Sequence, residues 1–302
     1  MSSGRVRAIL GPTASGKSAL GLAVAQAWSA RGVPTEIVAI DAFTVYRGMD
    51  LGTAKPDAMT RMRIPHHLID VLDPHEELSV VRFRTLAREA IADVHARGAT
   101  ALLVGGSGLY WRAVVDDLSF PPTDPAVREA VAGTVADDPT AAYEQLLESD
   151  PEAAAAIGAH NLRRLIRALE VIELTGQKFS TWDDAWKRYD SVYDDLEVLL
   201  LDPPNDALRA AIHARARIMV DDGLLDEARR LQGTSRSRTA AAAIGYPEAE
   251  AVLNGTLAVE RLADTIAERT WRYARRQRSW FRADPRCVTI GPEQLLSRWA
   301  EG

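Results

Sequence analysis

Apolar runs and amphipathic helical patterns alternate through both ends of the chain. The strand-like apolar runs cover residues 5–10, 36–41, 100–106 and 196–202. The helical patterns between and after them cover residues 18–32, about 80–97, about 205–221 and roughly 257–282. Strands that alternate with helices predict a parallel sheet, because each crossover helix packs back onto one of its faces. We therefore expect an α/β core with helices on both faces.

The middle of the chain has a different pattern. Between about residues 116 and 195, helical patterns are interrupted by proline and aspartate, and no segment has the alternation typical of a strand. This change predicts an all-helical domain inserted into the α/β core. The core is then expected to comprise residues 1–115 and 196–302.

Composition narrows the class of protein. The 302 residues are 47% hydrophobic and 26% charged, which is typical of globular chains. A single cysteine, Cys287, excludes a disulfide framework and a cysteine-ligated zinc site. The sequence has no run of about 18 apolar residues, the length needed to span a membrane. We expect a cytoplasmic protein that has no membrane partner and is a monomer.

Charge is distributed unevenly along the chain. The formal net charge of −6 disfavours a protein that coats nucleic acid without specificity. Between residues 266 and 286, however, seven arginines stand against Glu268 and Asp284, and four aromatic side chains lie among them. Basic residues with aromatic neighbours are typical of an RNA-binding face, but arginines also solvate long helices. The composition leaves both interpretations open.

A glycine-rich loop follows the first predicted strand. Residues 11–18 read GPTASGKS and match the pattern G-x-x-x-x-G-K-[ST], with a strand before and a helix after. Such a loop, typical of nucleotide-binding proteins, turns backbone N–H groups toward a phosphate, while its lysine adds positive charge and its serine can bind Mg²⁺. The predicted phosphate-binding residues are Gly11, Pro12, Thr13, Ala14, Ser15, Gly16, Lys17 and Ser18, with Ser18 as the Mg²⁺ ligand.

The aspartate that ATP- and GTP-hydrolysing proteins with this loop use for magnesium is not evident. The apolar strand at 100–106 ends in glycines where that aspartate is expected. Asp202 ends the strand at 196–202, but it leads directly into Pro203 and Pro204. Nucleotide hydrolysis is therefore disfavoured, although the loop still predicts a phosphate ligand.

Two charged residues are candidates for chemistry beside this loop. Asp41 ends an apolar run, so it lies at the carboxyl edge of the sheet, where the phosphate loop also opens. It is either a general base or metal ligand, or a residue that caps a turn. Arg215 shares a helical face with Ile212 and Met219. Its guanidinium either pairs with a carboxylate, extends to solvent, or binds the phosphate of a ligand.

Eight short motifs run in order through nearly the whole chain. They are GPTASGKS (11–18), DAFTVYRGMDLGTAKP (41–56), HHLID (66–70), FR (83–84), VGGSGLYWRAV (104–114), LRRLIRALEVIELTG (162–176), AIGYPEA (243–249) and YARRQRSWFRAD (273–284). In these motifs and their order the chain resembles the tRNA dimethylallyltransferases, or isopentenyl pyrophosphate:tRNA transferases. The resemblance implies a P-loop NTPase-like core with an inserted helical domain that binds the tRNA anticodon stem-loop.

The resemblance also implies a reaction and its residues. A dimethylallyl group passes from dimethylallyl diphosphate to N6 of adenosine 37, next to the tRNA anticodon, and pyrophosphate leaves. Asp41 is then the general base, Arg215 and Thr13 assist the diphosphate, and Mg²⁺ is the cofactor. The positions implied to contact tRNA are Asp41, Ala42, Phe43, Thr44, Ser107, Arg128, Arg163, Arg164 and Arg167.

The sequence departs from the family at the implied base-binding stretch. The family commonly has serine and glutamine where this chain has Ala42 and Thr44, so hydrogen-bonding groups that would contact the base are lost. Three other interpretations stay open. They are a transferase that prenylates free adenylate, a small-molecule kinase, and an RNA-binding protein with a nucleotide-responsive loop.

Overall fold

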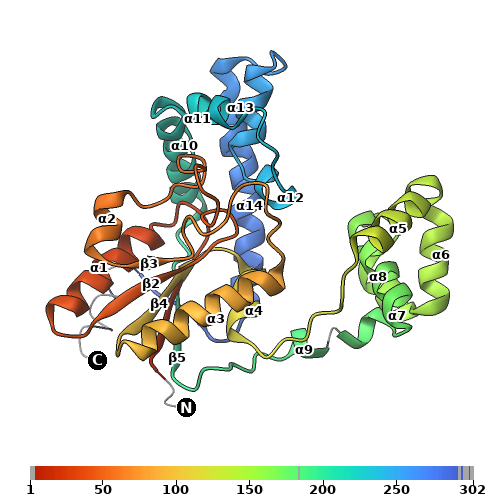
Figure 1. The fold of residues 1–302 in the computed structure, drawn as a ribbon, viewed down its shortest axis with the longest axis horizontal. Helices are drawn as coiled ribbons and strands as arrows, with labels where there is room; N and C mark the ends of the chain where they lie inside the picture. Colours follow the sequence, from red (N-terminus) through yellow and green to blue (C-terminus); the bar gives the residue numbers. More distant parts are fainter. Residues whose placement is uncertain (1–3, 183, 292–293, 295–298, 300–302) are drawn as a thin grey trace. The chain divides into compact units, whose positions relative to one another are not determined.

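The computed structural model describes residues 4–182, 184–291, 294 and 299, and it contains a six-stranded sheet (Figure 1). The strand order is β3-β2-β4-β1-β5-β6, and every neighbouring pair is parallel. The strands are β1 (Val6–Leu10), β2 (Thr35–Ile40), β3 (His66–His67), β4 (Thr100–Gly105), β5 (Leu196–Leu200) and β6 (Cys287–Thr289). The prediction of a parallel α/β sheet is confirmed.

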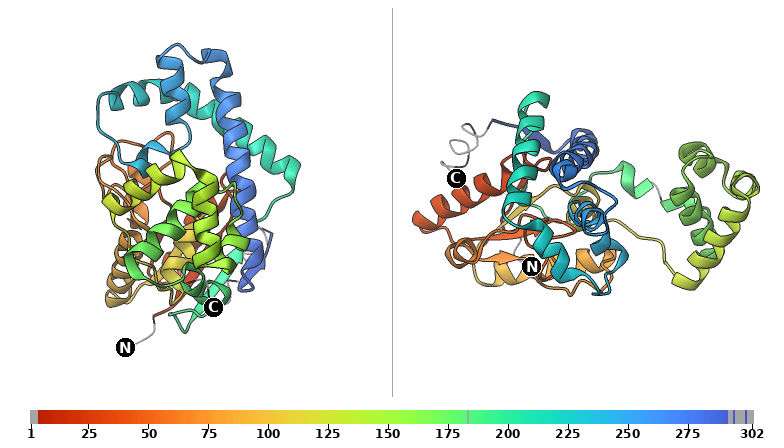
Figure 2. Two further views of the ribbon diagram at one scale, coloured as in Figure 1. Left: turned by 90° about the vertical axis from the view of Figure 1, so that its right-hand side faces the viewer. Right: turned by 90° about the horizontal axis from the view of Figure 1, so that it is seen from above.

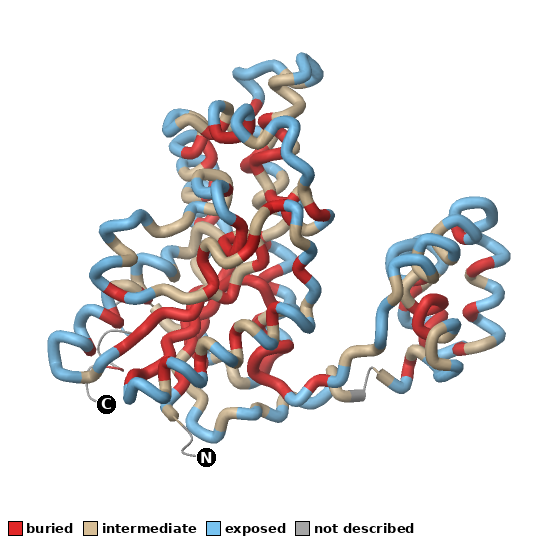
Figure 3. Tube along the Cα trace, viewed as in Figure 1, coloured by how far each residue is buried: buried red, intermediate tan, exposed pale blue. Residues whose placement is uncertain are grey.

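Helices cover both faces of this sheet. The helical elements of the α/β unit are α1 (Lys17–Ala30), α2 (Ala58–Arg63), α3 (Val80–Ala96), α4 (Gly108–Val115), α10 (Asn205–Asp221), α11 (Leu224–Leu231), α12 (Arg238–Ala241), α13 (Tyr246–Leu253), the 3₁₀ turn η2 (Val259–Arg261) and α14 (Leu262–Ala283). Along β1, Val6 and Ala8 pack into the core that includes α3, α4, α10 and α14, whereas Ile9 packs into the core that includes α1. The strands are therefore buried on both sides, as Figure 3 shows.

Several elements of the α/β unit differ from the sequence prediction, which did not include the short helices α2, α4, α11, α12 and α13. β3 and β6 were not expected, because they have two and three residues and no apolar run. The last helix begins at Leu262 rather than near residue 257, because η2 precedes it. β2 ends at Ile40, so Asp41 lies just beyond the strand.

The chain divides into two compact units, Met1–Asp116 with Ser191–Gly302, and Asp117–Asp190; the sequence pattern places these limits at 116 and 195. The second unit contains α5 (Pro125–Asp137), α6 (Pro139–Ser149), α7 (Pro151–Ile157), α8 (Leu162–Thr175), the 3₁₀ turn η1 (Phe179–Trp182) and α9 (Asp184–Lys187). Asp124, Asp138 and Asp150 accept hydrogen bonds from the first backbone N–H groups of α5, α6 and α7, and each is followed by proline. The prolines and aspartates that interrupt the sequence pattern are therefore helix starts.

In the α/β unit, α10 and α14 pack against each other, and the left view of Figure 2 shows α14 as a long blue helix. Their side chains reach the loop that follows β1, through Arg215 of α10 and Gln277 of α14. Within the described part of the chain, no helix combines the length and the apolar character needed to cross a bilayer.

Candidate active site

The loop between β1 and α1 makes a tight turn. Gly16 has a φ of 86°, a left-handed conformation that glycine adopts without strain, and α1 begins at the next residue. The backbone N–H of Ser15 donates to the carbonyl of Pro12 at 3.2 Å. Lys17 Nζ donates to the same carbonyl at 3.2 Å. The start of α1 therefore follows the glycine-rich turn directly, as in anion-binding loops.

A cavity of about 320 Å³ lies beside this loop. The ionisable side chains that line it include Lys17, Asp41 and Arg215. Its apolar lining comes from both cores: Leu22, Ile37 and Val104 from the α1 side, and Ile212, Met219 and Ile266 from the opposite side. The cavity thus combines charged groups with apolar surface, as expected for a ligand that has both characters.

Asp41 is the acidic member of this group. Its Oδ1 accepts hydrogen bonds from the backbone N–H of Phe43 at 2.8 Å and of Thr44 at 3.4 Å. No described residue hydrogen-bonds to Oδ2. One oxygen therefore fixes the side chain in a turn, and the other is available to a ligand.

Arg215 reaches the phosphate loop from α10. Its Nη1 donates to Thr13 Oγ1 at 2.9 Å. Burial lowers the pKa of Arg215, and the negative charge of Asp41 opposes this shift. None of the described carboxylates forms an ion pair with it, so the guanidinium faces the loop with a neutral partner.

Gln277 is a residue of the candidate site that the sequence analysis did not single out. Its Oε1 accepts from the N–H of Thr13 at 2.8 Å, and its Nε2 donates to the carbonyl of Gly106 at 2.8 Å. The side chain is buried and lies between the phosphate loop and the end of β4. Its position inside an arginine-rich helix was its only sequence signal, and that signal pointed to charge.

Lys17 is electrostatically unusual. Burial, and after it the charge of Arg215, lower its pKa to about 8, and the charge of Asp41 opposes this shift. A lysine in this position gains most from an anionic ligand, because the ligand compensates both the burial and the repulsion by Arg215.

Ser18 is exposed and lines the cavity beside Lys17. In the described residues there is no group of three or more histidine, cysteine, aspartate or glutamate side chains that could hold a metal ion.

The three residues after Asp41 differ in their surroundings. Phe43 and Thr44 line the cavity, whereas Ala42 is buried and is not among the lining residues. Thr44 is 9% exposed, and its Oγ1 has no hydrogen-bond partner in the described structure. The side-chain amide lost relative to the family's glutamine is thus partly replaced by a hydroxyl that a ligand can use.

The predicted tRNA contacts of the helical unit fall into two classes. Arg128 and Arg167 both pair with the buried carboxylate of Glu170 at 2.8 Å. Arg163 and Arg164 are exposed, and neither forms an ion pair with a described residue. In the α/β unit, Ser107 is buried, and its hydroxyl lies 3.3 Å from the hydroxyl of Tyr273, which lines the cavity.

The arginine-rich helix is divided in the same way. Four of the seven arginines between residues 266 and 286 form ion pairs: Arg269 with Glu248, Arg278 and Arg282 with Asp202, and Arg286, beyond the end of α14, with Asp116 and Asp284. The other three, Arg272, Arg275 and Arg276, are exposed. The structural interpretation therefore holds for the first set, and an RNA face can involve only the second.

Asp202 was the alternative magnesium ligand considered from the sequence. Its carboxylate lies 2.5 Å from Arg278 and 2.7 Å from Arg282. Both of its partners belong to α14, so it joins that helix to the end of β5 and does not serve the phosphate loop.

Known proteins resemble this chain over nearly its full length. The family model described as IPP transferase matches residues 44–284. The tRNA dimethylallyltransferase of Bifidobacterium longum is 46% identical over 284 residues, which are 93% of this chain and 85% of that protein. The tRNA dimethylallyltransferase of Kineococcus radiotolerans is 47% identical over 285 residues, which are 92% of this chain and 88% of that protein.

Solved structures have the same fold. The crystal structure of the full-length tRNA isopentenylpyrophosphate transferase from Bacillus halodurans matches with a TM-score of 0.70 and 36% sequence identity. The match covers 98% of this chain and 95% of that protein's chain. A eukaryotic dimethylallyltransferase is 24% identical with a TM-score of 0.79, a likeness that bears on fold alone. The expected P-loop NTPase-like core is confirmed, and the protein belongs to the IPP transferase family of tRNA dimethylallyltransferases.

Proposed function

We propose that the protein transfers the dimethylallyl group of dimethylallyl diphosphate to N6 of adenosine 37 in tRNA and releases pyrophosphate. The observation that carries this proposal is the meeting of Asp41, Lys17 and Arg215 in one cavity beside the phosphate loop. Transfer of an allyl group from a diphosphate needs a proton acceptor at one side and cationic groups at the other. The relatives compared above are named for this activity.

Asp41 acts on the acceptor. The lone pair of an adenine amine is delocalised into the ring, so the amine is a weak nucleophile until its proton is removed. Oδ2 of Asp41 takes that proton as N6 attacks the allylic carbon. The new C–N bond forms, the C–O bond to the diphosphate breaks, and its electron pair leaves with pyrophosphate.

The phosphate loop acts on the leaving group. Lys17 and Arg215 supply positive charge where the pyrophosphate oxygen becomes negative, and Thr13 holds Arg215 in place through its hydroxyl. Gln277 fixes the backbone of Thr13 and therefore supports the same contact. The loop thus serves diphosphate departure, and it needs neither a γ-phosphate nor the aspartate of nucleotide hydrolases.

Mg²⁺ belongs to the proposal as the cofactor, with Ser18 as its protein ligand. The exposed serine at the start of α1 fits an ion that keeps waters and takes phosphate oxygens as its other ligands. When bound, Mg²⁺ neutralises part of the diphosphate charge.

The acceptor base leaves its stack to reach Asp41, as for other enzymes that modify a base. Phe43 offers a ring and Thr44 an unpaired hydroxyl to the adenine. The helical unit comprises residues 116–195 by the limits drawn from the sequence. Its exposed residues Arg163 and Arg164 are available to phosphates of the anticodon stem-loop. We infer a cytoplasmic monomer as the working state.

The decisive experiment is incubation with Mg²⁺, dimethylallyl diphosphate and unmodified tRNA that carries adenosine at positions 36 and 37. Mass spectrometry of the digested tRNA is expected to show a prenylated adenosine. Prenylated AMP in place of modified tRNA would instead identify a transferase that acts on free nucleotides. Transfer of label from γ-labelled ATP would identify a kinase.

A further inference from the structure

The stretch at 49–56, which the reaction described above does not use, forms part of the cavity lining. Gly52, Ala54 and Pro56 line the cavity. The stretch is tightly turned: Ala54 has a φ of 51°, which residues with a side chain rarely adopt, and its N–H donates to the carbonyl of Leu51 at 3.0 Å. A strained turn keeps its shape only where its surroundings hold it.

Glu227, on α11, holds this stretch from one side. Its Oε2 accepts from the N–H of Asp50 at 3.1 Å and of Leu51 at 3.0 Å, and its Oε1 accepts from the N–H of Gly52 at 3.3 Å. The residue is 2% exposed, and no described cation forms an ion pair with it. Three successive backbone amides therefore compensate a buried carboxylate, in the manner of an anion-binding nest.

Tyr246, at the start of α13, completes this contact. Its hydroxyl donates to Glu227 Oε1 at 2.7 Å. Burial and the charge of Glu227 raise the pKa of Tyr246, so the hydroxyl keeps its proton and remains a donor. A Cβ on Gly52 would lie 2.5 Å from Cε2 of the Tyr246 ring, so only glycine allows this approach. The LGTAKP and AIGYPEA motifs thus meet at one point.

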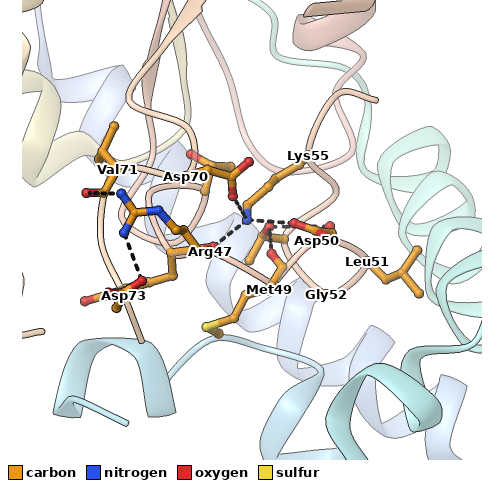
Figure 4. A network of polar contacts seen from close by, with 12 residues as sticks. Arg47, Met49, Asp50, Leu51, Gly52, Lys55, Asp70, Val71 and Asp73 are labelled. Carbon is orange, nitrogen blue, oxygen red and sulfur yellow. Dashed lines mark hydrogen bonds and ion pairs between the residues drawn. The ribbon is translucent and has the colours of Figure 1, made fainter. Parts of the chain in front are cut away.

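Lys55, which belongs to this stretch, ties it to the segment that follows β3 (Figure 4). Its ammonium lies 2.8 Å from Asp50 and 2.6 Å from Asp70, and its side chain is 3% exposed. Burial favours a raised pKa for Asp70, but the hydrogen bonds from Lys55 and Arg61 outweigh it and lower the pKa. The turn is therefore fastened both to α11 and to the segment that follows β3.

We propose that Glu227 is a positioning residue for the prenyl transfer, because it fixes the 49–56 wall against which the substrates pack. The expected effect of Glu227 on kinetics rests on the proposed function, whereas the contact between Glu227 and the 49–56 stretch does not depend on it. α10 and α11 are consecutive helices, so the same helical pair carries Arg215 toward the diphosphate and Glu227 toward the wall. Loss of the carboxylate leaves Lys17, Asp41 and Arg215 in place and loosens the 49–56 part of the cavity wall.

The test is Glu227→Gln, which keeps the side-chain volume and replaces one acceptor oxygen by a donor that faces backbone N–H groups. Charged hydrogen bonds of this kind are worth a factor of about ten or more. We expect hydrogen exchange of peptides covering residues 47–55 to become at least about tenfold faster, with exchange in β1 and β4 unchanged. We also expect KM for dimethylallyl diphosphate to rise by about tenfold.

The KM measurement separates positioning from folding. A purely structural defect reduces the fraction of active enzyme, and hence kcat, without changing KM. Unchanged KM in Glu227→Gln, or unchanged exchange at residues 47–55, would overturn the proposal. Glu260→Gln, at an exposed glutamate of η2, is the matched control and is expected to match the wild type in both measurements.

Tyr246→Phe keeps the inference testable if Glu227→Gln does not fold. It retains the ring against Gly52 and removes one donor to Glu227, so smaller increases of about two- to fivefold in exchange and KM are expected. Equality with the wild type in both would also overturn the proposal. If the wild type has no prenyltransferase activity, the proposed function fails, while the exchange measurements still decide whether Glu227 holds the wall.

Discussion

Arg215 in the α/β unit and Arg167 in the helical unit are both partly buried, but their partners differ. Arg167 donates to the carboxylate of Glu170 at 2.8 Å and to the carbonyls of Pro121 and Pro122. Arg215 donates to a neutral hydroxyl, that of Thr13, and no described carboxylate pairs with it. A guanidinium saturated by its own protein holds the fold, whereas one with a neutral partner is available to an anionic ligand. Sequence alone does not distinguish the two.

The largest effect on activity is expected from Asp41, the acidic residue that lines the cavity with Lys17 and Arg215. Asp41→Ala removes the proposed base, and kcat is expected to fall by about 10³-fold, because general-base catalysis commonly contributes 10²–10⁴-fold. Affinity for tRNA is expected to stay within about twofold, since the proposed base takes part in proton transfer. Single-turnover rates and filter binding measure the two quantities. Activity near that of the wild type would remove Asp41 from the mechanism.

The second largest effect on activity is expected from substitution of Arg215. Arg215→Ala is expected to lower kcat/KM for dimethylallyl diphosphate by about 10²-fold, the usual cost of losing a charged donor at a leaving group. Arg217→Ala is the control, because Arg217 is exposed on the same helix. Steady-state kinetics on both variants gives the comparison. Equal rates in the two would return Arg215 to a structural role.

The helical unit is expected to respond in stability. Glu170→Gln removes the negative charge with which both Arg128 and Arg167 pair. Because the two arginines are partly exposed to solvent, the free energy of unfolding is expected to fall by about 2 kcal/mol. Urea unfolding followed by circular dichroism measures this loss. Arg163→Ala is the contrasting variant, expected to leave unfolding unchanged and to weaken tRNA binding. The reverse pattern would contradict the division of these arginines.

The smallest effect concerns pH. Lys17 has a pKa lowered to about 8 from its ordinary value of 10.5, so the free enzyme loses this charge as pH rises through about 8. Binding of dimethylallyl diphosphate is therefore expected to weaken by about fivefold between pH 8 and 9, following the protonated fraction. For stability the sign is opposite: the cost of burying the charged lysine is relieved as pH rises from about 8 toward 10.5.

Arg215→Ala sharpens the pH measurement, because Arg215 is one cause of the lowered pKa of Lys17. In that variant the midpoint of the KM profile is expected to move to higher pH. A midpoint that stays in place would show that the two cations do not interact.

The sequence was sufficient for features that depend on local patterns. The apolar runs gave four of the strands, and the periodicity of residues 205–221 placed Arg215 among Ile212 and Met219. Asp41 followed from the rule that parallel strands open their sites at the carboxyl edge. These predictions need only neighbours along the chain.

Contacts between distant segments could not be predicted in this way. Gln277 is 264 residues from Thr13 in the sequence. Likewise, Arg278 pairs with Asp202 and Arg286 pairs with Asp116. Composition therefore could not show which arginines between residues 266 and 286 were already neutralised. The edge strands were missed because segments of two or three residues are too short to carry a periodic signal.

The long separation of Thr13 and Gln277 has a consequence for synthesis of the chain. The phosphate loop leaves the ribosome early, but the side chain that fixes its Thr13 is added 264 residues later. At translation rates of about 5–20 residues per second, this interval is about 13–53 s. During that time a nascent chain carries the sequence of the proposed diphosphate site without the side chain that fixes Thr13, so this site is completed only when α14 has been translated and has packed.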